Sequence, residues 1–592
     1  MRGFKDSIKV STPNNKPLDL SHQVNTTFDF FQFRPVLCEE VYPSEKFSVH
    51  LRDYYRAKPL AGAVYANMYK KYACFFVPYR ILWDKWSDFN TGGSNGKLEF
   101  NEPYITYYEF AKIAVNLYSA FDAESGSVRQ NLGAVYRNML DYWSDLGVDI
   151  SILYGQDDLS VFDATKMSKL HIPIKRFLAC RAIWFDWFRD QNLIGDDVRD
   201  IYCPKSFASS GLVTPDHDYE AYESFYVNPS VPTDTILQPL PVCVEKDYFT
   251  TMMTEPQRGG AAFVPVSLPS VDVNPGFATA TSTSSIGITA DSQKVFRNAP
   301  GFQTNANDII GMFDYNLVRV AKGVQKYLEK NNIAGGADLQ QLLAHWGTAP
   351  NPAVFQRSTY IGSFTDSMRI EEVVSPADTD AGSIAGEVST KINMTGNGKF
   401  EYTANEHGFL VIVQIARPEN TYTEGTRREV LHGCLGNGRF DYFTPELEKT
   451  GFQPAYAYEK CSQTFLSGSN ADPFACVGYV PRYAENKRQY NRFTGQMSTY
   501  LFRDLRVVRD FGAAQYSDND LFINADFTQI YGYPTSYRYD RFFEGELADL
   551  DHFDGWIAFD IKVDSPRSDY ASPLIENSKG DDITLPYAGV RM

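Results

Sequence analysis

Alternating apolar and polar residues near both ends of this 592-residue chain constrain its fold most strongly. Residues 47–52 (Phe-Ser-Val-His-Leu-Arg) alternate near the start, and residues 557–563 alternate near the other end. A period of two predicts half-buried β-strands. Residues 409–416 are almost continuously apolar and rich in β-branched side chains, which is typical of a strand buried on both faces. Strands supplied from both ends indicate a mainly β fold, namely an antiparallel β-sandwich or jelly roll.

Local signals predict the connections between these strands. The dipeptides Asn397-Gly398 and Asn437-Gly438 are typical of β-hairpin turns. Apolar residues at steps of three and four predict several helices within long insertions. The predicted helices cover residues 132–146 before Gly147, 174–193 before Gly195, 317–328, and 338–346 before Gly347.

The chain is long enough for several small domains, but one large sandwich with insertions also accommodates it. We expect residues 1–592 to form a single jelly-roll domain with large loop insertions that contain the helices. Residues 259–307 are rich in Ser, Thr, Ala and Gly, which predicts an exposed, variable insertion loop. We also expect a second exposed loop at 375–389, an N-terminal arm at 1–23 and a C-terminal arm at 564–592.

Composition favours extensive contacts between subunits. Aromatic residues make up 15% of the chain, and strands and protein interfaces use such side chains heavily. The net charge of −17 means that any contact with nucleic acid must be local or helped by a basic partner. The scattered cysteines lack a Cys-x-x-Cys pair and predict reduced thiols. Neither a secretory signal nor a membrane-spanning segment is predicted.

No motif predicts an enzyme. The sequence Gly92-Gly93-Ser94-Asn95-Gly96-Lys97 resembles a phosphate-binding loop, but its spacing is too short and Leu98 follows the lysine. Asp378-Thr379-Asp380 lacks the remaining ligands of a calcium loop. The histidines include no pair at the spacing of a helical zinc site. We therefore predict no catalytic, cofactor-binding or metal-binding residues.

A basic segment at residues 481–509 is the one candidate binding site. It contains seven basic and only two acidic residues, with aromatic residues between them. Guanidinium groups bind phosphates and aromatic rings stack on bases, so the pattern indicates a contact with single-stranded DNA. An interface whose arginines meet acidic neighbours is the alternative. The candidate residues are Arg482, Lys487, Arg488, Tyr490, Arg492, Arg503, Arg506 and Arg509.

Several segments resemble the major capsid protein of the Microviridae, particularly its gokushovirus-like branch. They occur in the order of that family and span most of the chain. The most specific is Cys74-Phe75-Phe76-Val77-Pro78-Tyr79-Arg80-Ile81-Leu82-Trp83-Asp84-Lys85-Trp86. The others are Trp184–Leu193, Asp247–Thr250, Pro256–Gly259, Arg357–Gly362, His407–Phe409, Arg439–Tyr442 and Gly478–Glu485.

This resemblance implies a structural protein, not an enzyme, that forms a small icosahedral T=1 shell around circular single-stranded DNA. It further implies assembly in the host cytoplasm, a place in the virion, and a surface protrusion at residues 259–307. The implied partners are further copies of the chain, the genome, a small basic DNA-binding protein, minor pilot or spike proteins and a host receptor. An exported β-sandwich that binds or hydrolyses carbohydrate is the alternative from another class.

Overall fold

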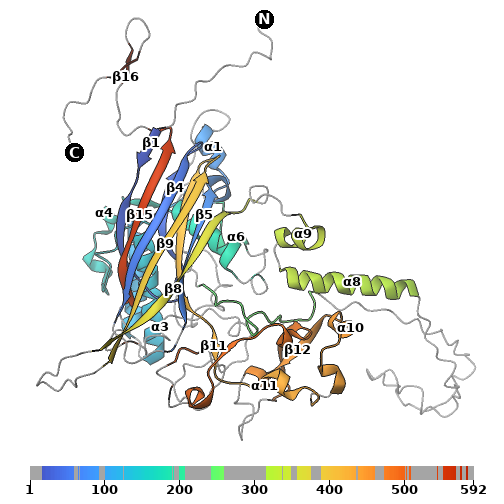
Figure 1. Cartoon of the computed structure of the whole chain (residues 1–592). Coiled ribbons are helices and arrows are strands. Elements are labelled where there is room, and N and C mark those ends of the chain that lie inside the picture. Colours follow the sequence, from blue (N-terminus) through green and yellow to red (C-terminus); the bar gives the residue numbers. More distant parts are fainter. Residues whose placement is uncertain are drawn as a thin grey trace, which may run out of the picture.

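The structure is a computed structural model of the whole chain (Figure 1). It describes residues 16–58, 65, 67–92, 101–123, 126–189, 191, 199–206, 242–258, 315–335, 338–348, 356–374, 388–434, 438–460, 472–499, 502, 506–508, 543, 551–567, 574–576 and 582–584.

Nine strands form the main β-structure, in the order β1-β15-β4-β9-β8-β5-β10-β3, and β2 pairs with β15 next to β1. Every pairing among them is antiparallel. The strands are β1 (Lys16–Asp19), β2 (His22–Phe28), β3 (Arg34–Val41), β4 (Lys46–Ala57), β5 (Met68–Pro78), β8 (Thr359–Val374), β9 (Val388–Thr403), β10 (Gly408–Pro418) and β15 (Phe553–Ser565).

Helices and short strands fill the connections. The helices are α1 (Trp86–Thr91), α2 (Tyr107–Ala123), α3 (Gly126–Asp145), α4 (Ala164–Met167), α5 (Lys175–Ile183), α6 (Arg199–Tyr202), α8 (Tyr315–Ala334), α9 (Asp338–Trp346), α10 (Pro445–Glu448) and α11 (Ala457–Lys460). The shorter turns are η1 (Tyr79–Ile81), η2 (Leu159–Val161), η3 (Trp184–Phe188), η8 (Arg428–Leu431), η9 (Gly438–Asp441), η11 (Ala484–Asn486) and η12 (Gly495–Ser498). The short strands are β6 (Tyr104–Thr106), β7 (His171–Pro173), β11 (Thr421–Tyr422), β12 (Phe452–Tyr456), β13 (Cys476–Pro481), β14 (Asn491–Arg492), β16 (Leu574–Glu576) and β17 (Asp582–Thr584).

The long strands β8 and β9 join two layers of strands. The last part of β8 pairs with the first part of β9, from Val374 opposite Val388. The first part of β8 pairs with β5, whereas the last part of β9 pairs with β4. One layer therefore contains β2, β15, β4 and β9, and the other contains β3, β10, β5 and β8.

Apolar side chains from both layers form one core. In β4 the alternate residues Phe47, Val49 and Leu51 are buried, which confirms the predicted period of two. They join Ile557 and Ile561 of β15 in a cluster that also contains residues of β5 and β10. Full burial of each such side chain stabilises the fold by about 1.5–3 kcal/mol.

Strand β10 is buried on both faces, as its apolar sequence predicts. Leu410 and Ile412 belong to the core between the layers. Val411 and Val413 face the other way and pack in a second cluster with α2, α3 and α5. The predicted helix at 132–146 is confirmed by α3, and the chain leaves it through Gly147, which has a positive φ of 93°. The helical layer thus covers one layer of strands.

The predictions for helices are partly confirmed. Helices α8 and α9 confirm the expected helices at 317–328 and 338–346. The expected helix at 174–193 was too long, because α5 continues only as a π-helical turn to Phe188. Arg189 is extended, and its Nε donates to the carbonyl oxygen of Phe185 at 2.7 Å, which closes the helix end.

The predicted turn at Asn397-Gly398 was wrong, because both residues lie within β9. The Phe364 ring of β8 approaches Gly398 so closely that a Cβ atom would lie about 2.0 Å from its Cε1. Gly398 therefore makes room for the Phe364 ring of β8. The glycine after Asn397 reflects this close packing and not a hairpin turn.

We predict that Gly398→Ala destabilises the folded chain by about 1–3 kcal/mol, because Phe364 must move. Thermal unfolding of the purified protein measures the effect. Gly323→Ala in α8 is the matched control, since no atom lies within 4 Å of the added Cβ. The control should stabilise the folded chain by about 0.5–1 kcal/mol. Equal effects of the two substitutions would contradict the prediction.

The predicted loops and arms lie largely outside the described residues. This holds for 259–307 and for 375–387, while Ser389 belongs to β9. Of the predicted N-terminal arm, Lys16–Asp19 forms β1, and β2 begins at His22. Asn437 and Lys97 also lie outside the described residues. No helix in the described part of the chain is long and apolar enough to cross a membrane.

Candidate functional site

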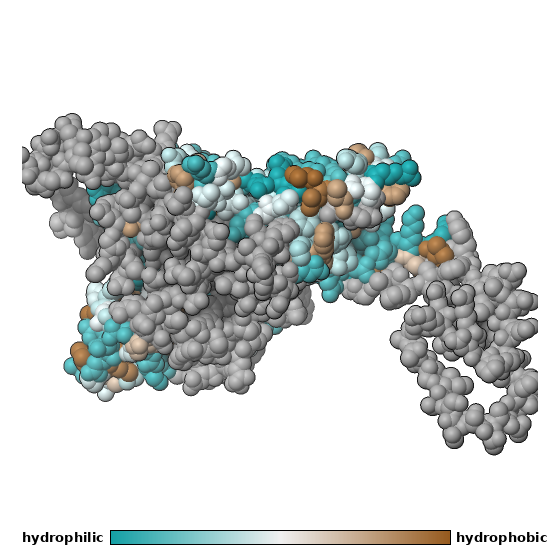
Figure 2. Space-filling view, turned by 90° about the horizontal axis from the view of Figure 1, so that it is seen from below, coloured by the Kyte–Doolittle hydropathy of each residue, from teal (hydrophilic) through white to brown (hydrophobic). Residues whose placement is uncertain are grey.

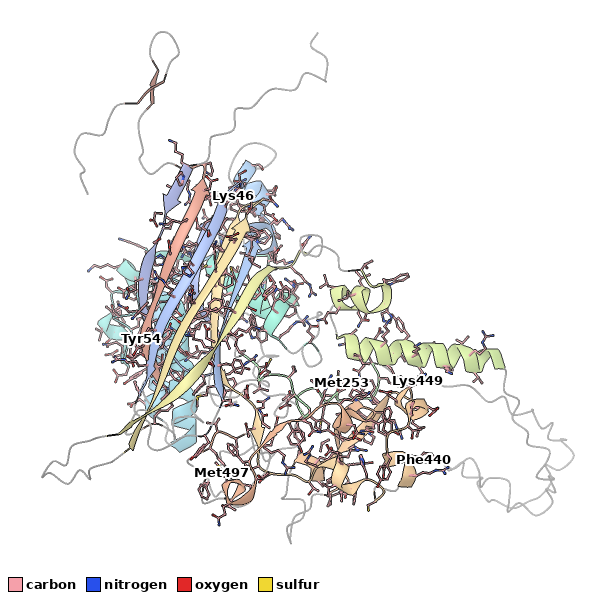
Figure 3. The ribbon with its side chains drawn as sticks, in the orientation of Figure 1. Lys46, Tyr54, Met253, Phe440, Lys449 and Met497 are labelled. Atoms are coloured by element: carbon pink, nitrogen blue, oxygen red, sulfur yellow. The ribbon has the colours of Figure 1, made fainter. Side chains whose placement is uncertain are left out.

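Residues 481–492 of the basic segment lie at a separate small core beside the main β-structure (Figure 3, near Met253, Lys449 and Met497). This core combines buried side chains from residues 242–258 with others from residues 419–499. Strands β12 and β13 pair across it, and β11 pairs with β14. Its members are Tyr248, Phe249, Met252, Tyr422, Ala455, Ala457, Val477, Val480 and Ala484, and Tyr490 packs against them.

Tyr490 packs into this core. Its ring centroid lies 4.8 Å from that of Phe249 and 5.5 Å from that of Tyr422. Burial raises the pKa of Tyr490. Arg492 lies over the Tyr490 ring at 5.9 Å, and its Nη2 donates to the carbonyl oxygen of Gly425 at 3.1 Å. Both side chains therefore help to hold the core together.

Three basic residues of the segment lie closer to solvent. Lys487 and Arg488 are exposed, and Arg482 is half-buried beside Tyr483. Lys487 forms an ion pair with Glu448 of α10. Arg488 donates from Nη1 to the Thr251 hydroxyl at 2.9 Å. Among these three cations, Arg488 is therefore the one whose described contact is a single hydrogen bond to a neutral hydroxyl group.

The rest of the segment does not form an exposed basic row among the described residues. Arg506 is 1% exposed, and its Nη1 donates to the carbonyl oxygen of Met497. Arg503 and Arg509 lie outside the described residues. The structure therefore brings Arg482, Lys487, Arg488, Tyr490 and Arg492 together around one core and places Arg506 in the interior.

A buried ion pair that the sequence analysis missed lies in the same core. Arg428 of η8 contacts Glu459 of α11 at 3.2 Å and Glu485 of η11 at 3.8 Å. Burial raises the pKa of Glu459, although Arg428 partly offsets it. Tyr248 donates to Glu459 at 2.8 Å, and Gln453 donates to Glu485 at 2.7 Å. These contacts connect segments far apart in sequence, so local charge counting could not find them.

A second buried network joins the strands to the helical layer. Arg34 of β3 donates to Asp145 of α3 at 2.6 Å and to Asp141 at 3.3 Å, and Asp551 lies 3.9 Å away. Burial, together with the charge of Asp551, raises the pKa of Asp141 well above its ordinary value.

The Cys74–Trp86 motif also has a structural role. It forms the end of β5 and η1, where the Tyr79 ring lies 4.7 Å from Trp86 and 4.8 Å from Phe409 of β10. Lys175 of α5 lies over the Tyr79 ring at 4.5 Å. The motif therefore packs the helical layer against the ends of strands β5 and β10.

The buried acids and bases in the described residues serve packing contacts. In that part of the chain no group of three or more His, Cys, Asp or Glu side chains could hold a metal ion. The buried charges of the Arg34 and Arg428 networks are instead paired with one another. These internal ion pairs hold neighbouring elements in contact.

Comparison with known proteins agrees with this structural role. The family model described as capsid protein (F protein) matches residues 7–114 and 154–507, which is most of the chain. Capsid protein VP1 of Chlamydia phage 1 is 24% identical over 84% of this chain and 86% of its own length. VP1 of Bdellovibrio phage phiMH2K is 24% identical over 88% and 90%, and VP1 of Spiroplasma virus 4 is 22% identical over 82% of both. The resemblance found in the sequence motifs is thereby confirmed, and the chain belongs to the phage capsid protein (F protein) family.

Proposed function

We propose that this chain is a major capsid protein that assembles into a small icosahedral T=1 shell around circular single-stranded DNA. The family match over most of the chain carries this proposal. Copies of a shell subunit contact one another over large surfaces, and closed symmetry repeats each contact many times. The matched relatives are capsid proteins, so they give no support to the carbohydrate-binding or hydrolase alternative.

We further propose that the two layers form a viral jelly roll. The order β2-β15-β4-β9 in one layer and β3-β10-β5-β8 in the other supports this assignment. In each layer strands from distant parts of the chain alternate, as two Greek keys require. The long connections from β5 to β8 and from β10 to β15 hold the helical layer and the small core as insertions into that framework.

The particle would be built in the host cytoplasm with a small basic DNA-binding protein, pilot or spike proteins and a receptor-binding surface. The chain carries a net charge of −17, so a basic partner and cations would neutralise most of the packaged DNA. Direct contact with the genome would come from the basic segment. Of its described basic residues, Lys487 and Arg488 are exposed, with Arg482 and Arg492 beside them.

Negative-stain microscopy tests the proposal of a shell. The full chain, expressed with its neighbouring genes, is expected to give round particles of uniform small diameter. A purified chain that remains monomeric under the same conditions, or that turns over a polysaccharide, would contradict the proposal.

For the basic segment, Lys487→Glu with Arg488→Glu is expected to lower the DNA content of purified particles without preventing folding. Both side chains are exposed, so the small core should remain intact. Nuclease-protected DNA per particle is the measurement. Lys16→Glu with Lys46→Glu is the matched control, since these exposed residues lie on strands β1 and β4. Equal DNA content in both variants would remove the segment as a genome contact.

A further inference from the structure

Helix α8 presents three distinct faces. Its packed face contacts residues 255–258, because Asn332 donates to the carbonyl oxygen of Glu255 at 2.7 Å and Gln325 donates to Gln257. A second face carries basic residues and a third carries apolar residues, and both are exposed. The helix is therefore held along its packed face and, near its C-terminal end, by α9, where Gln341 donates to the carbonyl oxygen of Asn331 at 3.3 Å (Figure 1).

The basic face is a continuous row. Arg319, Lys322, Lys326 and Lys330 follow one another at steps of three and four, so they line one side of the helix over about 16 Å. All four are exposed, and none forms an ion pair with any residue that the structure describes. Among the described residues this row is therefore a cluster of positive charge without an acidic partner, in a chain whose net charge is −17.

The neighbouring face is apolar. Val320, Val324 and Tyr327 recur at steps of four and three and are 60%, 43% and 54% exposed. Helix α9 covers only the end of this row, where His345 stacks on Tyr327 at 4.7 Å. On α9 itself, Leu343 and Trp346 are 52% and 77% exposed. Exposed apolar residues in such a group mark a surface that another molecule covers.

Residues 149–170 have the complementary character. They lie over α2 and α3, where Tyr136 donates to the carbonyl oxygen of Leu153 at 2.9 Å. Four exposed acidic residues are present here, namely Asp149, Asp157, Asp158 and Asp163, against two exposed lysines, Lys166 and Lys169. Lys166 pairs with Asp163 at 3.1 Å, so Asp149, Asp157 and Asp158 carry the excess negative charge. Four exposed apolar residues lie among them, namely Ile152, Tyr154, Val161 and Leu170. We call residues 149–170 the acidic surface and the exposed faces of α8 and α9 the basic surface.

Hydrogen bonds within the acidic surface favour the charged form of two of its carboxylates. Hydrogen bonds from Ser151 lower the pKa of Asp149, and hydrogen bonds from Ser160 lower the pKa of Asp158. Asp163 accepts backbone hydrogen bonds from Thr165 and Lys166 at the start of α4. These hydrogen bonds therefore favour negative charge at Asp149 and Asp158.

The two surfaces lie at opposite sides of the subunit, with α4 on one side and α8 on the other (Figure 1). They cannot meet within one chain in this arrangement. Apolar residues on the described surface occur in small separate groups among hydrophilic ones (Figure 2). An interface on this protein would therefore combine several small apolar contacts with surrounding charged contacts.

We propose that the basic surface of one copy docks on the acidic surface of the next copy, and that this contact joins neighbouring subunits in the shell. This proposed contact rests on the proposed shell-forming function and specifies which residues join the copies. Because two different surfaces meet, the contact is heterologous, and repeated head-to-tail contacts close into a ring when the rotation permits. Opposite charges steer the copies into register, and the apolar rows exclude water.

A second copy explains these observations better than nucleic acid. DNA would use the basic row, but it would leave the apolar row and Trp346 without a partner. It would also leave the acidic surface unexplained. A copy of the chain supplies both the opposite charge and the apolar groups from one surface.

Charge reversal tests the contact. The basic-surface variant carries Lys326→Glu with Lys330→Glu, and the acidic-surface variant carries Asp157→Lys with Asp158→Lys. Each is expected to reduce the yield of particles by about tenfold or more, since like charges then face each other in every copy. One chain carrying all four substitutions should recover the yield, because each reversed surface again meets its complement.

The controls separate this inference from the proposed function. Thermal unfolding of the unassembled basic-surface variant should match that of the original chain, because both side chains are exposed. The acidic-surface variant should remain folded but unfold at a slightly lower temperature, because Asp158 caps η2. If the original chain forms no particles, the proposed function fails. The inference alone is overturned if the original chain forms particles and the single-surface variants do so equally well. Failure of the fourfold variant to recover also overturns it, as do normal yields with reduced DNA content in the basic-surface variant, which would assign the row to the genome.

Discussion

Arg34→Ala is expected to destabilise the unassembled subunit by about 3–5 kcal/mol, because it leaves buried carboxylates without their cation. The Arg34 side chain is 4% exposed and lies between Asp145, Asp141 and Asp551. These residues come from β3, α3 and the turn before β15, so the substitution loosens the contact between the strands and the helical layer. Near-UV circular dichroism during thermal unfolding measures the loss.

An exposed ion pair provides the control for Arg34. Arg56 lies 3.2 Å from Asp554, with 64% and 42% of the two side chains exposed. Solvent and salt screen such a pair, so Arg56→Ala should change the stability by about 0–1 kcal/mol. If the two arginine variants unfolded at the same temperature, the buried network around Arg34 would not contribute to stability as its geometry indicates.

Trp143→Ala is expected to destabilise the subunit by about 3–5 kcal/mol through the cavity that it leaves. The Trp143 ring is 1% exposed and stacks on Phe177 of α5, with centroids 5.2 Å apart and an angle of 10° between the planes. Phe110 of α2 packs against it at 5.1 Å. One side chain thus holds α2, α3 and α5 together, and calorimetric unfolding of the purified subunit should show the loss.

Trp346→Ala is the matched control, since this tryptophan is 77% exposed at the end of α9. Its removal should leave the unfolding temperature of the unassembled subunit nearly unchanged. The proposed docking surface includes Trp346, so the same substitution should lower the yield of particles. A comparable loss of stability in both tryptophan variants would contradict the packing described for Trp143.

Strands and helices with a strong hydrophobic period could be predicted from the sequence. The alternation at 47–52 and the apolar run at 409–416 reflect burial on one or both faces, and the period alone encodes it. Asn397-Gly398 misled the prediction because a glycine serves close packing as well as turns. Only the position of Phe364 on the neighbouring strand distinguishes the two uses.

The candidate site was harder to predict because charge pairing depends on three-dimensional neighbours. Residues 481–509 are locally basic, yet Lys487 meets Glu448 and Tyr490 packs against Phe249, which lies more than 200 residues away. By contrast, the row formed by Arg319, Lys322, Lys326 and Lys330 is visible in the sequence at helical spacing. The helix was predicted from its apolar positions alone, so the basic row on its other face was not predicted.

The place of β15 in the main β-structure has a consequence for synthesis. This strand lies between β2 and β4, although at least 495 residues separate it from each of them along the chain. Until the ribosome has released residues 553–565, the facing edges of β2 and β4 have no partner, and non-local pairing of this kind is slow. A nascent or truncated chain therefore cannot complete the scaffold, which delays the association of copies until translation has passed this strand.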